Sequence, residues 1–280
     1  MALLAIDVTD DGPRPHDGGH LGPTVDAALA DVPPDAPVVI LIHGYRYSPM
    51  TQADNPHRHI LSLVPRKDCW KALSWPRHLG FGRGHQAEGL CVAFGWEARG
   101  SIWRAWRNAH RAGAALADLV KAIRARHPGA VHIVAHSLGA RVALAAMPLL
   151  PRCSLGRVIL MAAAEFQSTA ASAFATPAGQ TAEVFNIQSA ENAFFDRCLE
   201  WCVPAPSKGD RALGAGLDVW APNWLDIRVD DCATRDALRR LGHRIPAPRR
   251  KVCHWCPHIQ TCSKRTVTFR WRRNTPFQAS

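Results

Sequence analysis

The stretch VHIVAHSLGARVAL, residues 131–144, indicates both the fold and the position of a site. Its first half is an apolar run typical of a strand buried on both faces, and its second half has the spacing of an apolar helix. Ser137 lies at the junction, with Ala135 two residues before it and Gly139 two residues after it. The stretch therefore predicts a strand, a tight turn that holds a serine, and a helix.

Ser137 has two interpretations. A serine at the start of a helix can act only as a cap, because its side chain accepts a hydrogen bond from a free backbone N–H. The alternative is a nucleophile raised on a sharp turn, which needs small residues two positions before and after the serine. Ala135 and Gly139 meet that need. The Leu138 N–H would then point at a developing oxyanion, and the helix dipole would favour its charge. We favour the nucleophile.

Similar apolar runs recur along the chain and alternate with helical patterns. The strand-like runs are residues 38–44, 89–96, 131–136, 157–164 and 183–189, with a weaker one at 224–229. Helical spacing occurs at 106–123 and 138–150, and residues 10–37 are expected to form a loop with a short helical piece at 25–30. This alternation predicts an α/β fold with a mostly parallel sheet and helices on both faces.

The length of 280 residues and a hydrophobic content of 47% predict a single domain over residues 1–280. Residues 45–88 interrupt the alternation with four prolines and are long for a connection, so they predict a loop-rich insertion. Such an insertion is either a functional loop over the site or a packed surface segment.

The net charge of +11 comes from the C-terminal part of the chain. Residues 237–280 hold eleven Lys or Arg and no Asp or Glu. This basic segment is most simply a solvated face, so we expect no clear nucleic-acid or membrane partner. The chain has no long apolar run and begins without a basic leader, which predicts a cytoplasmic protein with reduced cysteines.

A second motif, His43-Gly44-Tyr45, ends the run at residues 38–44. Gly44 lets a substrate approach the backbone closely, and the Tyr45 N–H is our candidate for a second oxyanion donor.

Three motifs together resemble the α/β-hydrolase superfamily. They are VVILIHGY at 38–45, AHSLGARVAL at 135–144 and HW at 254–255. FGW at 94–96, the S-x-E-N pattern at 189–192 and CHW at 253–255 resemble a bacterial branch of serine hydrolases of the esterase or lipase type. The resemblance implies the α/β-hydrolase fold, a serine, acid and histidine in that chain order, and no metal or organic cofactor.

The resemblance also suggests the other members of a catalytic triad. The acid is expected close behind the strand at 183–189, which favours Glu191, with Asp196 as the alternate. The base is expected late in the chain, where His254 matches the family's HW motif and His258 is the alternate. His136, next to the serine, is expected to be a pocket residue.

The late histidines also allow a different reading. Cys253, Cys256 and Cys262 with His254 or His258 could form a zinc site, but no second C-x-x-C pair follows, so free thiols and no metal are expected. The sequence therefore predicts a serine hydrolase that cleaves a small-molecule carboxylic ester through an acyl-enzyme. The alternative is an inactive protein of this fold whose basic segment binds an anionic partner.

Overall fold

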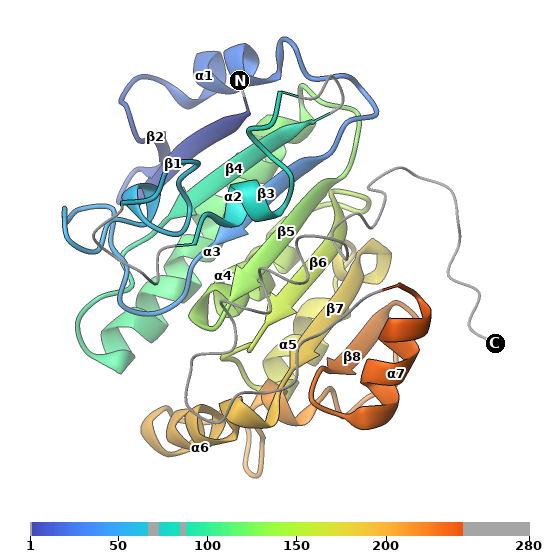
Figure 1. Cartoon of the computed structure of the whole chain (residues 1–280). Helices are drawn as coiled ribbons and strands as arrows, with labels where there is room; N and C mark the ends of the chain where they lie inside the picture. The colour runs from blue at the N-terminus through green and yellow to red at the C-terminus, as the bar shows by residue number, and fades with distance from the viewer. Residues whose placement is uncertain (1, 67–72, 85–87, 243–280) are drawn as a thin grey trace.

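A computed structural model describes residues 2–66, 73–84 and 88–242. Its centre is an eight-stranded sheet in the order β2-β1-β4-β3-β5-β6-β7-β8 (Figure 1). The strands are β1 (Leu3–Thr9), β2 (Gly12–Pro15), β3 (Val38–Ile42), β4 (Leu90–Gly95), β5 (Val131–His136), β6 (Leu155–Met161), β7 (Glu183–Gln188) and β8 (Trp224–Arg228). All neighbours pair in parallel except β1 and β2. This is the mostly parallel sheet that the sequence predicted.

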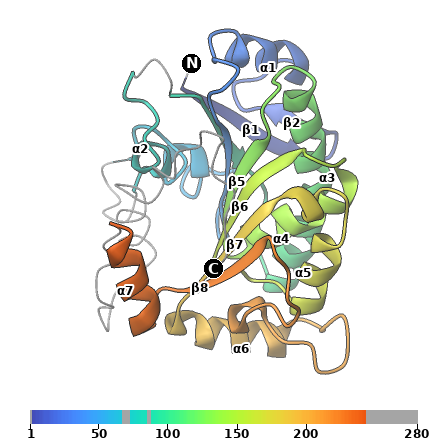
Figure 2. The same cartoon turned by 90° about the vertical axis from the view of Figure 1, so that its right-hand side faces the viewer.

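Helices lie on both faces of the sheet (Figure 2). The helices are α1 (Leu21–Leu29), α2 (Trp75–His78), α3 (Ile102–Arg124), α4 (Leu138–Ala146), α5 (Gln167–Phe174), α6 (Ala193–Cys202) and α7 (Cys232–Arg240). In Figure 2, α1, α3, α4 and α5 cover one face, and α2 and α7 lie on the other. The fold is that of an α/β-hydrolase, as the sequence predicted. None of the helices in the described part of the chain is long and apolar enough to cross a membrane.

β3 is apolar throughout because both of its faces are covered. Alternate side chains of a strand point to opposite faces. Val38, Ile40 and Ile42 of β3 pack in the cluster that contains the buried faces of α3 and α4, whereas Val39 and Leu41 pack in a second cluster. The continuous apolar runs in the sequence follow from this double burial.

The insertion after β3 supplies much of the second cluster. Ile60, Leu61, Trp75 and Phe81 are buried there against strand residues. The described part of the insertion is thus a packed layer, and Trp75 also brings it into contact with His136 at the end of β5.

The N-terminal prediction was partly wrong. Residues 3–9 form a strand that we did not predict, residues 12–15 form another where a loop was expected, and the helix begins at Leu21 rather than near residue 25. We did not predict the second strand because it contains Pro13 and Pro15, and proline is rare inside strands. Proline is compatible with β2 because β2 is an edge strand that pairs only with β1.

Candidate active site at the end of β5

Ser137 occupies a strained turn between β5 and α4. Its backbone has φ of 53° and ψ of −122°, a region that residues other than glycine rarely adopt. Three backbone hydrogen bonds hold it there. The Ser137 N–H donates to the Met161 carbonyl (2.9 Å), and the Ser137 carbonyl accepts from the N–H groups of Ala140 (2.9 Å) and Ala164 (3.1 Å). The surrounding strands and helix therefore impose this conformation.

The capping interpretation of Ser137 does not fit this geometry. Within the described residues its side chain makes no capping hydrogen bond to α4. The residues two positions away are small, as the turn requires. Ala135 is fully buried, and a Cβ on Gly139 would lie 2.7 Å from the carbonyl oxygens of both Ile42 and His43.

The chain after β3 passes directly beside Ser137. A Cβ on Gly44 would lie 2.9 Å from both the His136 carbonyl oxygen and Ser137 Cβ, so only glycine fits this approach. Among the described residues, the backbone N–H groups of Tyr45 and Leu138 donate no hydrogen bond. Leu138 is the first residue of α4, where backbone N–H groups lack partners inside the helix.

His43 fixes the backbone at Gly44, a role that its place in the sequence did not reveal. The backbone N–H of Trp96 donates a hydrogen bond to His43 Nε2 (3.1 Å). Nδ1 therefore carries the proton and donates to the Gly44 carbonyl (2.9 Å). The Trp96 indole N–H in turn donates to the His43 carbonyl (3.0 Å), and the two rings stack with centroids 5.5 Å apart. Burial lowers the pKa of His43 to about 3, so the ring is neutral. The only sequence signal was its place before a strand-ending glycine.

His136 lies beside Gly44, on the side of the insertion. A Cβ on Gly44 would lie 3.2 Å from His136 Nδ1, and the Trp75 ring meets the His136 ring edge-on with centroids 6.0 Å apart. Burial lowers the pKa of His136 to about 4. The insertion therefore reaches the residue next to Ser137.

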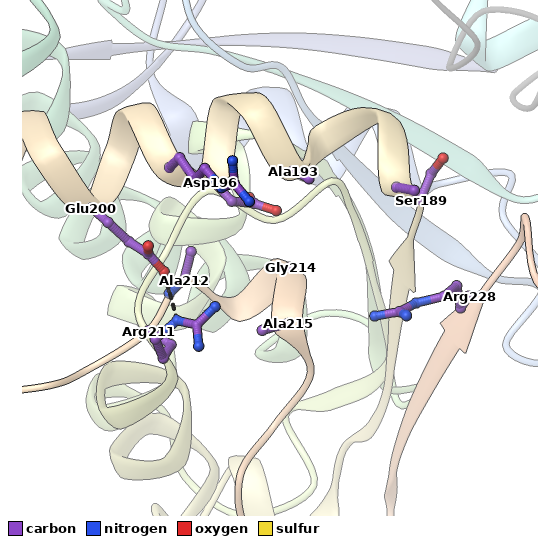
Figure 3. Close-up of a pocket in the computed structure, with 11 residues that line it drawn as sticks. Ser189, Ala193, Asp196, Glu200, Arg211, Ala212, Gly214, Ala215 and Arg228 are labelled. Carbon is purple, nitrogen blue, oxygen red and sulfur yellow. Dashed lines mark hydrogen bonds and ion pairs between the residues drawn. The ribbon is translucent and has the colours of Figure 1, made fainter.

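The two candidate acids lie in different surroundings. Glu191 is in the short 3₁₀ helix Ala190–Asn192 that follows β7 directly, where its N–H donates to Ser189 Oγ (3.4 Å). Asp196 lies further along, on α6, and lines a cavity of about 240 Å³ with Glu200, Arg211 and other residues (Figure 3). Burial and the charge of Glu200 raise the pKa of Asp196 to about 6.

A buried ion pair lies next to the segment that hydrogen-bonds to Ser137. Arg141 on α4 contacts the fully buried Glu165 through Nη1 and Oε2 (2.5 Å), and its guanidinium lies 3.7 Å from the centroid of the Trp106 ring on α3. Glu165 follows Ala164, whose N–H binds the Ser137 carbonyl. No sequence motif marked this pair, because its members are 24 residues apart.

Most of the basic segment at 237–280 lies outside the described part of the chain, and so do five candidate site residues. They are the candidate bases and the three cysteines of the possible zinc site: His254, His258, Cys253, Cys256 and Cys262.

Comparison with known proteins identifies the family. The sequence matches the model of the Alpha/beta hydrolase family over residues 39–273. That match covers most of the chain, and the chain belongs to the alpha/beta hydrolase family. Its class is therefore that of a hydrolase. No curated protein matches the sequence. Among solved structures, the lipase BlEst2 of Bacillus licheniformis in its mature form is similar at 11% identity and a TM-score of 0.37, over 70% of this chain and 84% of that one.

Proposed function

We propose that the protein is a serine hydrolase that cleaves carboxylic esters, with Ser137 as its nucleophile. The observation that carries this proposal is the strained backbone of Ser137 at the carboxyl end of a central strand. Such strain costs free energy and persists where the surroundings impose it, which is common at active sites. The close approach of Gly44 supplies the second wall of the site.

The proposed reaction proceeds through an acyl-enzyme. Ser137 Oγ attacks the ester carbonyl while a histidine removes its proton, and the same histidine then protonates the departing alcohol. The N–H groups of Leu138 and Tyr45 hold the oxyanion. Water activated by the histidine then attacks the acyl-enzyme and releases the carboxylic acid.

We assign the general base to His254, with His258 as the alternate. The two histidines that the structure places beside the turn are poorly suited to this role. A general base works best with a pKa near the working pH, whereas burial lowers the pKa to about 3 in His43 and about 4 in His136. Both ring nitrogens of His43 are also used in hydrogen bonds. A base from the later part of the chain is therefore preferred.

We assign the acid to Glu191. The triad acid stabilises an imidazolium ion, so it must be ionised when the enzyme works. Burial and the charge of Glu200 raise the pKa of Asp196 to about 6, so part of it is protonated just below neutral pH, and Asp196 faces the cavity beside Arg211. Glu191 follows its strand directly, as expected for the acid.

A fluorophosphonate probe tests the nucleophile. Wild-type protein should be labelled at Ser137, located by peptide mass spectrometry, and Ser137→Ala should not be labelled. Ser172→Ala is a matched control, because Ser172 is an exposed serine on α5 and its loss should leave labelling intact. An unlabelled wild type, or equal labelling of Ser137→Ala, would refute the proposal and favour the non-catalytic alternative.

Ester hydrolysis tests the other two assignments. A panel of p-nitrophenyl esters of increasing length would define the acyl group that fits. With the best substrate, Glu191→Gln should lower kcat by up to about 10⁴-fold, as the matching change does in a well-studied triad. Asp196→Asn should have a much smaller effect, and the reverse ranking would move the role to Asp196. His254→Ala should abolish labelling, and if only His258→Ala does so, His258 is the base.

A further inference from the structure

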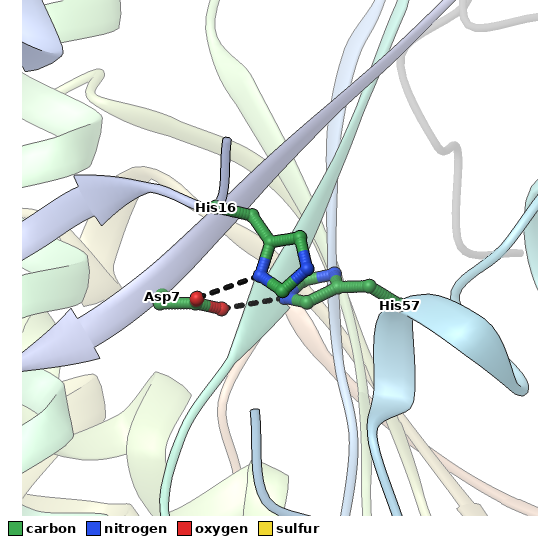
Figure 4. A group of neighbouring side chains, drawn as sticks. All are labelled: Asp7, His16 and His57. Carbon is green, nitrogen blue, oxygen red and sulfur yellow. Dashed lines mark hydrogen bonds and ion pairs between the residues drawn. The ribbon is translucent and has the colours of Figure 1, made fainter. Parts of the chain in front are cut away.

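Three side chains that the proposed reaction does not use converge near the edge of the sheet (Figure 4). Asp7 is on β1, His16 follows β2, and His57 is in the 3₁₀ helix Pro56–Arg58 of the insertion. Asp7 Oδ2 lies 2.8 Å from His16 Nδ1, and Asp7 Oδ1 lies 2.7 Å from His57 Nε2. Each residue offers one potential ligand atom, and these atoms lie within 4.8 Å of one another.

The cluster is largely shielded from solvent and open at one end. The side chains of His57 and Asp7 are 5% and 14% exposed, whereas that of His16 is 28% exposed. Gly95 of β4, paired with Asp7, makes room for the cluster. A Cβ on Gly95 would lie 2.6 Å from His57 Nε2 and 3.0 Å from Asp7 Oδ1.

Within the part of the chain that the structure describes, hydrogen bonding leaves one buried nitrogen of this cluster without a partner. His57 Nδ1 is buried and has no hydrogen-bond partner among the described residues. If the cluster were only a hydrogen-bonded group, His57 would donate through Nε2 to Asp7 and leave a buried acceptor unpaired, which is unfavourable. With a metal ion on Nε2 the proton moves to Nδ1, and the stronger bond at Nε2 would offset the cost of leaving that N–H unpaired.

We propose that Asp7, His16 and His57 bind one divalent transition-metal ion, with zinc as the best match. Two imidazole nitrogens and one carboxylate oxygen form a donor set that suits zinc, and Mg²⁺ or Ca²⁺ would prefer an all-oxygen site. Tetrahedral zinc with bonds of about 2.0–2.1 Å separates its ligand atoms by about 3.3 Å. The two nitrogen–oxygen contacts of 2.8 and 2.7 Å involve different oxygens of the Asp7 carboxylate, and the three ligand atoms lie within 4.8 Å of one another, so side-chain rotations would have to bring one Asp7 oxygen and both nitrogens to this spacing. Water would take the fourth position, on the exposed side near His16.

The proposed ion joins parts of the chain that are distant in sequence. Asp7 and His16 belong to the N-terminal strand pair, and His57 belongs to the insertion. The same insertion carries Trp75, which contacts His136 beside Ser137. The ion would therefore fix the insertion against the sheet, and this role is independent of the proposed esterase chemistry.

Zinc titration of the full-length, metal-free protein tests the proposal. Affinity is measured by competition with a chromophoric chelator, for wild type, Asp7→Asn, His16→Ala and the control His20→Ala. His20 is an exposed histidine in the same segment. Wild type and His20→Ala should bind one zinc ion. Asp7→Asn and His16→Ala should bind it more weakly by over about 100-fold, beyond the effect of losing a supporting contact.

Two further measurements distinguish this site from a zinc site formed by the late cysteines. Co²⁺ should give the spectrum of nitrogen and oxygen ligands, and Cys253→Ser/Cys256→Ser/Cys262→Ser should bind zinc as wild type does. Zinc should raise the Tm of wild type but not of His16→Ala, whose partly exposed side chain can be removed without unfolding the protein. Wild-type affinity in Asp7→Asn or His16→Ala, or a thiolate charge-transfer band with loss of zinc in the cysteine variant, would overturn the proposal.

Discussion

Replacing Ser137 with glycine should stabilise the fold even though it removes the proposed nucleophile. The serine backbone has φ of 53° and ψ of −122°, which glycine adopts without the clash that a Cβ creates. The comparison that isolates this effect is Ser137→Gly against Ser137→Ala, because both variants lack the hydroxyl and only alanine keeps the Cβ.

The expected difference follows from two opposing terms. Strain at such a position costs about 1–3 kcal/mol in the folded state, and glycine removes it. Glycine also makes the unfolded chain more flexible, which costs about 0.4–1 kcal/mol. Ser137→Gly should therefore be more stable than Ser137→Ala by about 1–2 kcal/mol, or about 2–6 °C in Tm.

Urea denaturation and thermal melts measure the difference directly. Ser172 on α5 provides the matched control, since glycine there should be less stable than alanine by about 0.5–1 kcal/mol, as in any helix. Neither Ser137 variant should react with the fluorophosphonate. If Ser137→Gly is no more stable than Ser137→Ala, the turn is not strained and the main support for a nucleophile at this position is lost.

Two further predictions concern buried titratable side chains near the turn. Arg141→Met should destabilise the protein by about 3–5 kcal/mol in urea denaturation, because it leaves the Glu165 carboxylate buried without its positively charged partner, and Arg141→Met/Glu165→Gln should recover part of the loss. Stability should also fall on acidification, because burial lowers the pKa of His43 to about 3 and of His136 to about 4, so the unfolded chain binds protons that the folded chain does not. The loss should begin near pH 6.5 and reach about 1.4 kcal/mol per pH unit for each histidine, until His136 is protonated near pH 4 and His43 near pH 3. Urea midpoints that do not change between about pH 6.5 and 4.5 would contradict this account.

The sequence predicted the parts of this structure that depend on neighbouring residues. A strand covered on both faces is apolar at every position, so runs such as residues 38–42 and 90–94 were visible without any knowledge of their partners. The turn at Ser137 could also be predicted from the local sequence, because it needs small residues two positions before and two positions after the serine.

What the sequence did not predict depends on contacts between distant segments. β1 was missed because Asp7 interrupts its apolar pattern, and His57 lies 50 residues from Asp7, with no motif spacing to connect them. His43 was read only as part of a motif, because its hydrogen bonds run to Trp96, 53 residues away. Pairing of parallel strands brings such residues together, and a local pattern does not encode that pairing.

The two small residues around Ser137 are not equivalent, and the structure explains why one of them is alanine. Ala135 lies within β5, opposite Ile42 of β3 and Leu160 of β6, where its Cβ projects from the sheet like that of any strand residue. Gly139 lies in the first turn of α4, where the carbonyl oxygens of Ile42 and His43 leave no space for a Cβ. The end of β3 therefore sets the requirement for glycine after the serine, and the strand before the serine accepts alanine.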